Sequence, residues 1–321
     1  HKNGTFARTV ERALAYLKLR QDREGCIALT EGGQRGGGYM YCHAIATLAF
    51  AEAYAMTKDP LLREPAERAV DFICTTQNAT GGWRYYYNSP DGDSSVSGWM
   101  VMALRSASLA GLVVPPRVFD NARRFFDSVT DKAAGKTYYM RVTADASDGR
   151  VGVLPMGLAL NAVGLLAHQY LGLPGDDPYI DKASAVILET PPKWAEKSDN
   201  IALPLDKLAL LTSTNNYYFW YYANLALHQR PGPAWDKWHP QVRDLLLKIM
   251  DRDGDKEGSW PPLTYAGSTG GRVYSTALAI LTLEAYYRYA PMYREAVDYR
   301  RYRKTFTPGQ SARNGIPRVR M

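Results

Sequence analysis

The stretch Tyr41-Cys-His-Ala-Ile-Ala-Thr-Leu48-Ala-Phe-Ala-Glu-Ala-Tyr54 decides the fold. It is apolar nearly all round and rich in small side chains, so a helix of this sequence must be buried on most sides. Four similar segments follow at intervals of 56 to 61 residues, measured between equivalent leucines. They are residues 97–111, 156–172, 221–229 and 274–289. This recurrence indicates five copies of one structural unit.

An amphipathic segment precedes each of these buried segments. In one of them Leu62, Ala66 and Ile73 share a face, whereas Arg63 and Glu67 stay polar, as in a helix half-covered by its neighbours. The predicted outer helices are Thr5–Arg20, Leu61–Thr76, Arg117–Ser128, Tyr179–Glu189 and Trp235–Met250. Glycines and prolines punctuate the connections, and no strand-like alternation is long enough to build a sheet. The sequence therefore predicts an all-α fold, an α/α toroid of about five helical hairpins with inner and outer layers.

Charge divides the chain into two parts. The net charge is +7, and residues 291–321 carry eight Lys/Arg and two Asp/Glu, a balance of +6. We therefore predict a single near-neutral toroid domain over residues 1–290, without a nucleic-acid partner, and a basic tail over 291–321. The tail is either a solvated terminus or a contact for a membrane surface or an acidic partner. Three cysteines without a CxxC pair are too few for a disulfide scaffold.

The linkers between outer and inner segments carry a family resemblance. Gln77-Asn-Ala-Thr-Gly-Gly-Trp83 resembles the QW repeat of squalene and oxidosqualene cyclases. Degenerate copies of it occur at Gln21–Cys26 and Gly258–Trp260. The stretches 81–85, 93–99, 221–226 and 271–279 resemble uncharacterised bacterial prenyltransferase and squalene-oxidase repeat proteins. The resemblance implies the terpenoid cyclase and protein prenyltransferase superfamily, with an axial cavity for an isoprenoid-like ligand. It also implies a structural role for the linker Gln and Trp residues. Together with the missing Met start, it leads us to expect an exported protein, periplasmic or at the cell surface.

The best candidate for catalysis is Asp91-Gly92-Asp93-Ser94, just before the second inner segment. It resembles the DxDD motif with which terpene cyclases protonate an alkene, but the last aspartate is replaced by Ser94. We take Asp93 as the candidate acid and Asp91 as its helper, because a carboxyl kept protonated by its surroundings can act as an acid. The alternative is structural, with Asp93 and Ser94 capping the helix and Asp91-Gly92 forming a turn.

A metal site receives less support from the sequence. The zinc set of the protein prenyltransferases is missing, because no Asp-x-Cys motif occurs. His43, His168 and His228 lie on inner segments and would have to meet across the axis, whereas lone histidines there are more often core residues. We predict neither a metal nor another cofactor.

Aromatic residues are the densest feature and predict a pocket. The run Tyr217–Tyr222 covers all sides of a helix, so some of its rings must face the axis whichever way that helix turns. An aromatic-lined axial cavity would hold a hydrophobic small molecule or a glycan, although the same rings could simply fill the barrel. The candidate binding residues are Trp99, Tyr39, Tyr218, Trp220, Tyr274, His43 and Arg84.

Three functions stay open at this point. The main expectation is a terpene-cyclase-like toroid that acts on or binds an isoprenoid-like ligand. The first alternative is a non-catalytic binding or scaffold module. The second is a carbohydrate-active enzyme of the hydrolase or lyase type, which would use acidic groups such as Asp91, Asp93, Asp145 or Asp148 with Arg84.

Overall fold

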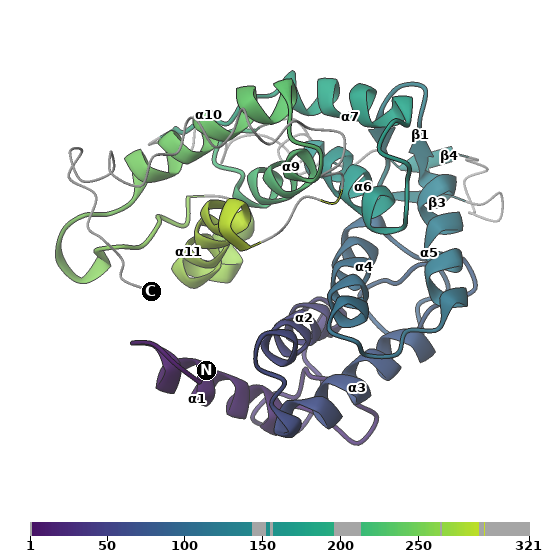
Figure 1. Cartoon of the computed structure of the whole chain (residues 1–321), viewed down its shortest axis with the longest axis vertical. Helices are drawn as coiled ribbons and strands as arrows, with labels where there is room; N and C mark the ends of the chain where they lie inside the picture. The colour runs from purple at the N-terminus through teal and green to yellow at the C-terminus, as the bar shows by residue number, and fades with distance from the viewer. Residues whose placement is uncertain are drawn as a thin grey trace.

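The computed structural model describes residues 2–142, 152–154, 157–195, 213–263, 265–288 and 292. Helices alternate between two layers along this part of the chain, as Figure 1 shows. The outer helices are α1 (Ala7–Leu19), α3 (Pro60–Thr75), α5 (Pro116–Val129), α7 (Pro178–Leu188) and α10 (Pro233–Ile249). The inner helices are α2 (Tyr39–Thr57), α4 (Ser94–Leu109), α6 (Leu158–Tyr170), α9 (Tyr217–Gln229) and α11 (Tyr265–Arg288). The predicted helical hairpins are therefore confirmed, with the outer helices beginning and ending within about two residues of expectation.

The inner helices follow one another around an arc. Packing runs from α2 to α4, α6, α9 and α11, and each outer helix lies behind the inner layer. In Figure 1 the α1–α2 hairpin and α11 face each other across an opening. Apolar side chains stay exposed on both end helices, Ile45 on α2 and Val273 on α11, as expected where an inner helix lacks one neighbour. This arrangement is the predicted α/α toroid.

Two short hairpins interrupt the helical pattern between α5 and α6, where no strand was predicted. Strand β1 (Thr130–Asp131) pairs antiparallel with β2 (Lys136–Thr137), and β3 (Met140–Val142) pairs antiparallel with β4 (Gly152–Leu154). Ladders of two or three residues are too short to produce a visible alternation of apolar and polar residues. They satisfy backbone hydrogen bonds in a long connection between an outer and an inner helix.

Two linker glutamines each join a hairpin to the next one. The Gln77 amide nitrogen donates to the carbonyl oxygens of Gly81, 2.9 Å away, and of Val118 in α5, 3.0 Å away. Gln21 repeats the pattern, donating to Gly25 at 3.1 Å and to Pro65 in α3 at 2.9 Å. One side chain thus ties its own linker to the following outer helix. This geometry fits the structural role expected for these residues.

Trp83 and Trp260 each hydrogen-bond to both helices of their own hairpin. The Trp83 indole donates to the carbonyl of Ile73 in α3 at 2.9 Å, and its backbone N–H donates to Ser97 on α4. Trp260 does the same, donating to Leu246 in α10 at 2.8 Å and to Thr276 on α11. In the first hairpin the backbone N–H that bonds to the inner helix belongs to Ile27. Ile27, and not Cys26 as the sequence suggested, therefore stands at the tryptophan position.

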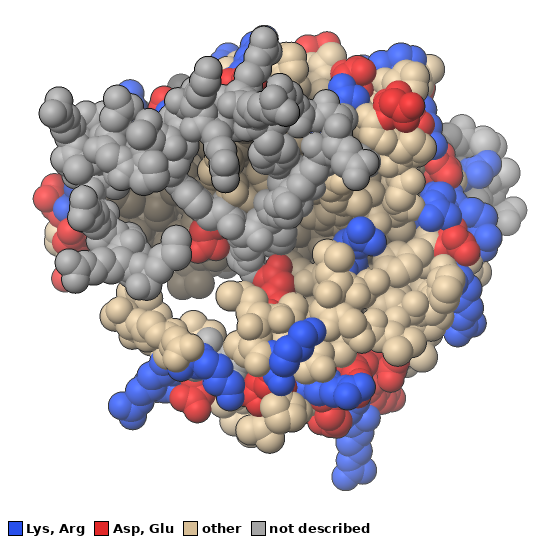
Figure 2. Space-filling model, viewed as in Figure 1, with Lys and Arg blue, Asp and Glu red and all other residues tan. Residues whose placement is uncertain are grey.

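The charged surface is mixed. Figure 2 shows Lys and Arg side chains interspersed with Asp and Glu over the visible face, without one large area of a single sign. None of the helices in the described part of the chain has the length and apolar character needed to cross a bilayer. The basic tail predicted for residues 291–321, and the acidic candidates Asp145 and Asp148, lie outside the described residues apart from Met292.

A glycine in each of the first two linkers touches the next outer helix. A Cβ on Gly81, whose φ is +87°, would lie 2.3 Å from the carbonyl oxygen of Asn121 in α5. Gly25, with φ +97°, meets the carbonyl oxygen of Arg68 in α3 at the same 2.3 Å. Glycine is required at both positions for two reasons. The backbone is left-handed, and there is no room for a methyl group.

These contacts predict the effect of a matched pair of substitutions. Gly258 has a similar φ of +75° but nothing within 4 Å of its would-be Cβ. We expect Gly258→Ala to lower the free energy of unfolding by about 1 kcal/mol, the cost of the left-handed backbone alone. Gly81→Ala should cost about 3 kcal/mol or more, because α5 must also move away. Urea denaturation of both variants measures this. Equal losses of unfolding free energy would show that the close contact with α5 adds nothing to the cost.

Candidate functional site

The candidate site lies at the rim where the inner helices begin. Because the outer and inner helices of each hairpin run in opposite directions, the linkers from an outer to an inner helix reach this same rim. The linker before α4 carries Arg84, Tyr85, Asp91 and Asp93. Residues from α2, α9 and the β-hairpin connection surround it, as the contacts below show. We call the following residues the Asp93 cluster: Asp93, Asp91, Arg84, Tyr85, Ser95, Tyr41, Tyr139 and Tyr218.

Asp93 is both a helix cap and a buried acid. Its Oδ1 accepts the backbone N–H of Val96 at 2.8 Å, which satisfies a free donor in the first turn of α4. The side chain is 0% exposed, and Oδ2 has no hydrogen-bond partner among the described residues. Burial raises the pKa of this carboxyl from about 3.8 to about 7, against the opposing effects of the Val96 N–H and the Arg84 charge. A carboxyl in this state holds its proton near neutral pH.

Asp91 is in a different environment two residues away. Both of its oxygens lie close to the Arg84 guanidinium, at 2.7 and 2.8 Å from the same nitrogen. The two side chains are about one-third exposed, 29% for Arg84 and 32% for Asp91. The rim therefore presents an ion-paired carboxylate to solvent beside a buried carboxyl whose pKa is raised.

Tyrosines from distant parts of the chain surround Asp93. The hydroxyls of Tyr85 and Tyr139 hydrogen-bond to each other, and Asp93 contributes to the electrostatic environment of Tyr139. The Tyr218 hydroxyl bonds to Ser95 at 2.7 Å, and Ser95 also bonds to Tyr41. Burial raises the pKa of Tyr41, Tyr139 and Tyr218, so these hydroxyls are neutral donors or acceptors.

Ser94, which stands where the cyclase motif ends in aspartate, has a positioning role. Its backbone N–H donates to the carbonyl of Tyr139 at 2.8 Å, and its hydroxyl donates to the carbonyl of Tyr138 at 2.5 Å. These bonds hold the segment that carries Tyr139 against the first turn of α4. The departure from DxDD thus has a structural reason, and it leaves Asp93 as the buried acid of this linker.

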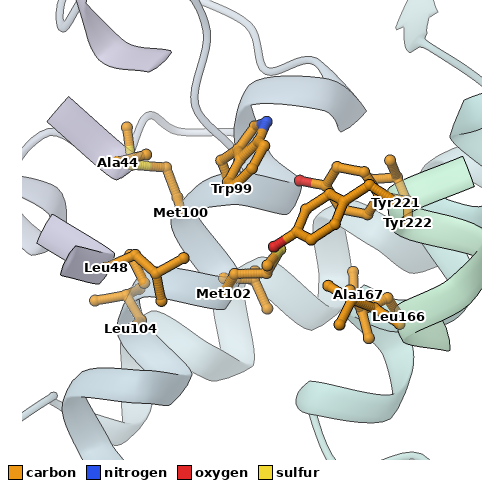
Figure 3. Close-up of a cluster of buried hydrophobic side chains, with 14 of the residues drawn as sticks. Ala44, Leu48, Trp99, Met100, Met102, Leu104, Leu166, Ala167, Tyr221 and Tyr222 are labelled. Atoms are coloured by element: carbon orange, nitrogen blue, oxygen red, sulfur yellow. The ribbon is translucent and has the colours of Figure 1, made fainter. Parts of the chain in front are cut away.

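Trp99 belongs to a packed group of rings. Its ring stacks on Tyr221 with centroids 5.6 Å apart and meets Tyr222 edge-on at 5.4 Å. Figure 3 shows these three rings together, with Met102 and Leu166 nearby. Trp99 is only 4% exposed, so it packs between α4 and α9. Tyr41 on α2, Tyr218 on α9 and Tyr274 on α11 are half-buried and keep some exposed surface.

Three predicted binding residues lie away from the Asp93 cluster. Tyr39 sits beneath the linker, where its hydroxyl accepts the Tyr87 N–H at 2.9 Å. Trp220 is 0% exposed and donates its indole N–H to the Ser213 carbonyl, so it does not face the axis. His43 points to the outer layer, which corrects the expectation that it lines the cavity.

The inner-helix histidines are core residues that contact outer helices. His43 Nδ1 accepts the Ile27 N–H, Nε2 lies 3.1 Å from the Ala69 carbonyl oxygen, and burial lowers its pKa to about 3. His168 packs on Phe126 of α5 and Tyr179 of α7, and His228 packs on Trp235 of α10. They therefore do not meet across the axis. Within the described ranges, no three His, Cys, Asp or Glu side chains are grouped so that they could hold a metal ion.

Sequence reasoning missed Tyr85, Ser95 and Tyr139 as members of the site. Tyr85 directly follows Arg84 in the linker, so its neighbourhood was visible in the sequence. Tyr139 lies in a connection without any repeat signal, 46 residues after Asp93, and only the fold brings it to Tyr85.

Solved structures of an α-1,6-mannanase, GH76A of Salegentibacter sp. HEL1_6, are similar to this chain. An inactive variant in complex with α-1,6-mannotriose shares 13% identity, with a TM-score of 0.52 over 87% of this chain and 98% of that one. A second inactive variant, with α-1,6-mannotetrose, shares 12% identity, with a TM-score of 0.53 over 88% and 99%. No family model and no curated protein matches the chain. The likeness shows the α/α toroid fold, and it does not support the terpenoid cyclase family that the linkers suggested.

The state of Asp93 makes a prediction about stability and pH. The folded protein binds this proton more tightly than the unfolded chain, so the contribution of Asp93 is largest below about pH 4 and falls as pH rises to about 7. The amide in the Asp93→Asn variant would keep the cap oxygen but would carry no charge. We therefore expect the stability of Asp93→Asn relative to wild type to increase by roughly 2 to 4 kcal/mol between pH 4 and 7.5.

Urea denaturation at several pH values measures this difference, and it cancels the effects of the histidines, which both proteins share. Asp177→Asn is the matched control, because Asp177 caps α7 through the Tyr179 N–H but is partly exposed. It controls for the loss of a capping carboxylate, because its partly exposed side chain keeps contact with water. A pH-dependent difference for Asp93→Asn no larger than that of the control would mean that Asp93 is an ordinary cap.

Proposed function

We propose that this chain is a carbohydrate-active enzyme that cleaves a glycan at the rim, with Asp93 as its general acid. The observation that carries the proposal is the contrast between Asp93 and Asp91. One is a buried carboxyl with an oxygen free of hydrogen bonds among the described residues and a pKa of about 7, and the other is a partly exposed, ion-paired carboxylate. Two carboxyls held in different protonation states are the requirement for hydrolysis of a glycosidic bond.

Each carboxyl would take one role in the reaction. Asp93 would give its proton to the glycosidic oxygen as the carbon–oxygen bond breaks. Asp91 would activate a water molecule or attack the sugar itself, with Arg84 holding its orientation. The water supplies a hydroxyl to the sugar carbon and returns a proton to the enzyme. Half-buried Tyr41, Tyr218 and Tyr274 offer flat faces and hydroxyls against which a sugar ring can lie.

Access to Asp93 requires a local movement. The side chain is 0% exposed, so a substrate reaches Oδ2 only when a neighbouring tyrosine shifts. The hydrogen bond between Tyr85 and Tyr139 joins the linker to the neighbouring connection and is the contact whose opening would admit a sugar. The proposal therefore includes a rearrangement of this tyrosine pair on binding.

The similar mannanase supports a glycan as ligand but not a particular linkage. Its complexes contain α-1,6-linked mannose oligosaccharides, and its inactive variants have two adjacent aspartates replaced. In this chain the sole pair of adjacent aspartates is Asp176–Asp177. That pair follows inner helix α6 and therefore lies at the opposite rim, where Asp177 caps α7. The proposal accordingly covers the class of substrate and leaves out the linkage.

A non-catalytic glycan-binding module is the second candidate. The complete burial of Asp93 and its bond to the Val96 N–H favour it, because both are explained by capping alone. In that case the partly exposed tyrosines and the Arg84–Asp91 pair would bind sugar without turnover.

A panel assay distinguishes these functions. The purified protein is incubated with α-1,6-mannan, β-1,4-mannan, xylan, arabinan and polygalacturonate, and the release of reducing ends is measured. We expect cleavage of one polymer, a loss of about a hundredfold or more in Asp93→Asn, and wild-type activity in Asp177→Asn. Activity should fall as pH rises above about 7, because the acid form of Asp93 is needed.

Retention of a polymer in affinity gels without cleavage would contradict the enzyme proposal and support the non-catalytic binding module. Neither cleavage nor retention, together with a rise in melting temperature on adding isoprenoid diphosphates, would overturn the glycan proposal.

A further inference from the structure

Two large aromatic side chains lie exposed beside the Asp93 cluster. Tyr86 is 49% exposed and Tyr87 is 52% exposed, and they follow directly after Arg84 and Tyr85 on the same linker. Two adjacent exposed rings form a small aromatic surface that solvent and ligands can reach. The linker that carries them also carries Arg84 and Tyr85 of the Asp93 cluster.

Both rings are held in place from below. The Tyr86 ring meets the buried Tyr39 ring edge-on, with centroids 5.8 Å apart. The backbone N–H of Tyr87 donates to the Tyr39 hydroxyl at 2.9 Å. The Arg35 guanidinium lies 5.6 Å from the centre of the Tyr87 ring, and Asp22 fixes that guanidinium at 2.7 Å. A surface already ordered in this way loses little conformational entropy when a ligand binds.

The surroundings favour a polar ligand with flat apolar faces. Arg35 and its carboxylate partners lie beside the Tyr87 ring, and the exposed Asn88 follows the two tyrosines in the chain. A protein partner would need a wider apolar area than two rings. A sugar residue fits better, because its C–H face can lie on an aromatic ring while its hydroxyls bond to the polar groups around it.

We propose that Tyr86 and Tyr87 form an outer subsite that stacks a sugar residue of a glycan chain extending from the Asp93 cluster. The preferred ligand is then a polymer or long oligosaccharide, and short oligosaccharides that cannot reach the two rings bind more weakly. This inference rests on the proposed function, since it assumes that a glycan occupies the rim.

The test compares ligand lengths in variants that bind without turnover. Asp93→Asn serves as the parent, and Tyr86→Ala, Tyr87→Ala and Tyr16→Ala are added to it one at a time. Tyr16 is the matched control, because it is 53% exposed and has the Arg20 guanidinium 4.6 Å from its ring centre, but it lies on outer helix α1. Affinity gels with the five polymers of the panel identify the ligand, and titration calorimetry follows with its disaccharide to hexasaccharide.

We expect affinity for the longest oligosaccharides to fall about five- to tenfold in Tyr86→Ala and Tyr87→Ala, and affinity for the disaccharide to stay unchanged. The Tyr16→Ala variant should match its parent at every length. Equal binding by all variants, or an equal loss at every length, would overturn the outer subsite while leaving the glycan proposal standing. No binding of any polymer by either the parent or the wild type would remove both proposals together.

Discussion

The hydrogen bonds of the Gln77 amide, shared between its own linker and α5, fix the step from one hairpin to the next. Gln21 makes the same pair of bonds to its linker and α3, and a glycine in each linker lets the backbones touch. These contacts are short and directional, whereas the apolar packing of the helices behind them is not. Because outer and inner helices run in opposite directions, the outer-to-inner linkers reach one rim, and a functional site can be assembled there from residues of several hairpins.

The Asp93 cluster lies at this rim, and its residues keep the structural contacts that the repeat needs. Asp93 meets the structural demand of a helix start through one oxygen and leaves the other without a partner among the described residues. Ser94, the next residue, holds the Tyr138–Tyr139 segment against the same turn. A buried polar atom without a partner carries a cost in stability, and such costs concentrate at functional sites. The same turn of helix thus supports the fold and supplies the proposed acid.

The layers of the fold were predictable because they follow from periodicity. An amphipathic outer helix shows its buried face in the sequence, and α3 and α10 begin and end within about two residues of expectation. The inner helices are apolar on all sides, so their sequences do not reveal which face meets the axis. His43 and Trp220 were expected at the axis and instead pack away from it, whereas Tyr218 bonds to Ser95 of the site. The two short β-hairpins were missed because ladders of this length leave no periodic signal.

The sequence by itself determined the helical units, their two layers, a structural role for the linker Gln and Trp residues, and Asp93 as the candidate acid. These depend on local spacing and on side-chain type, which any reader of the chain can count. Only the tertiary structure decided that Asp93 is a buried acid with a pKa of about 7. That property comes from the loss of water around one carboxyl, at a place where Tyr41, Tyr139 and Tyr218 from three distant parts of the chain lie near enough to feel its charge. Desolvation depends on the whole fold, and no local pattern records it.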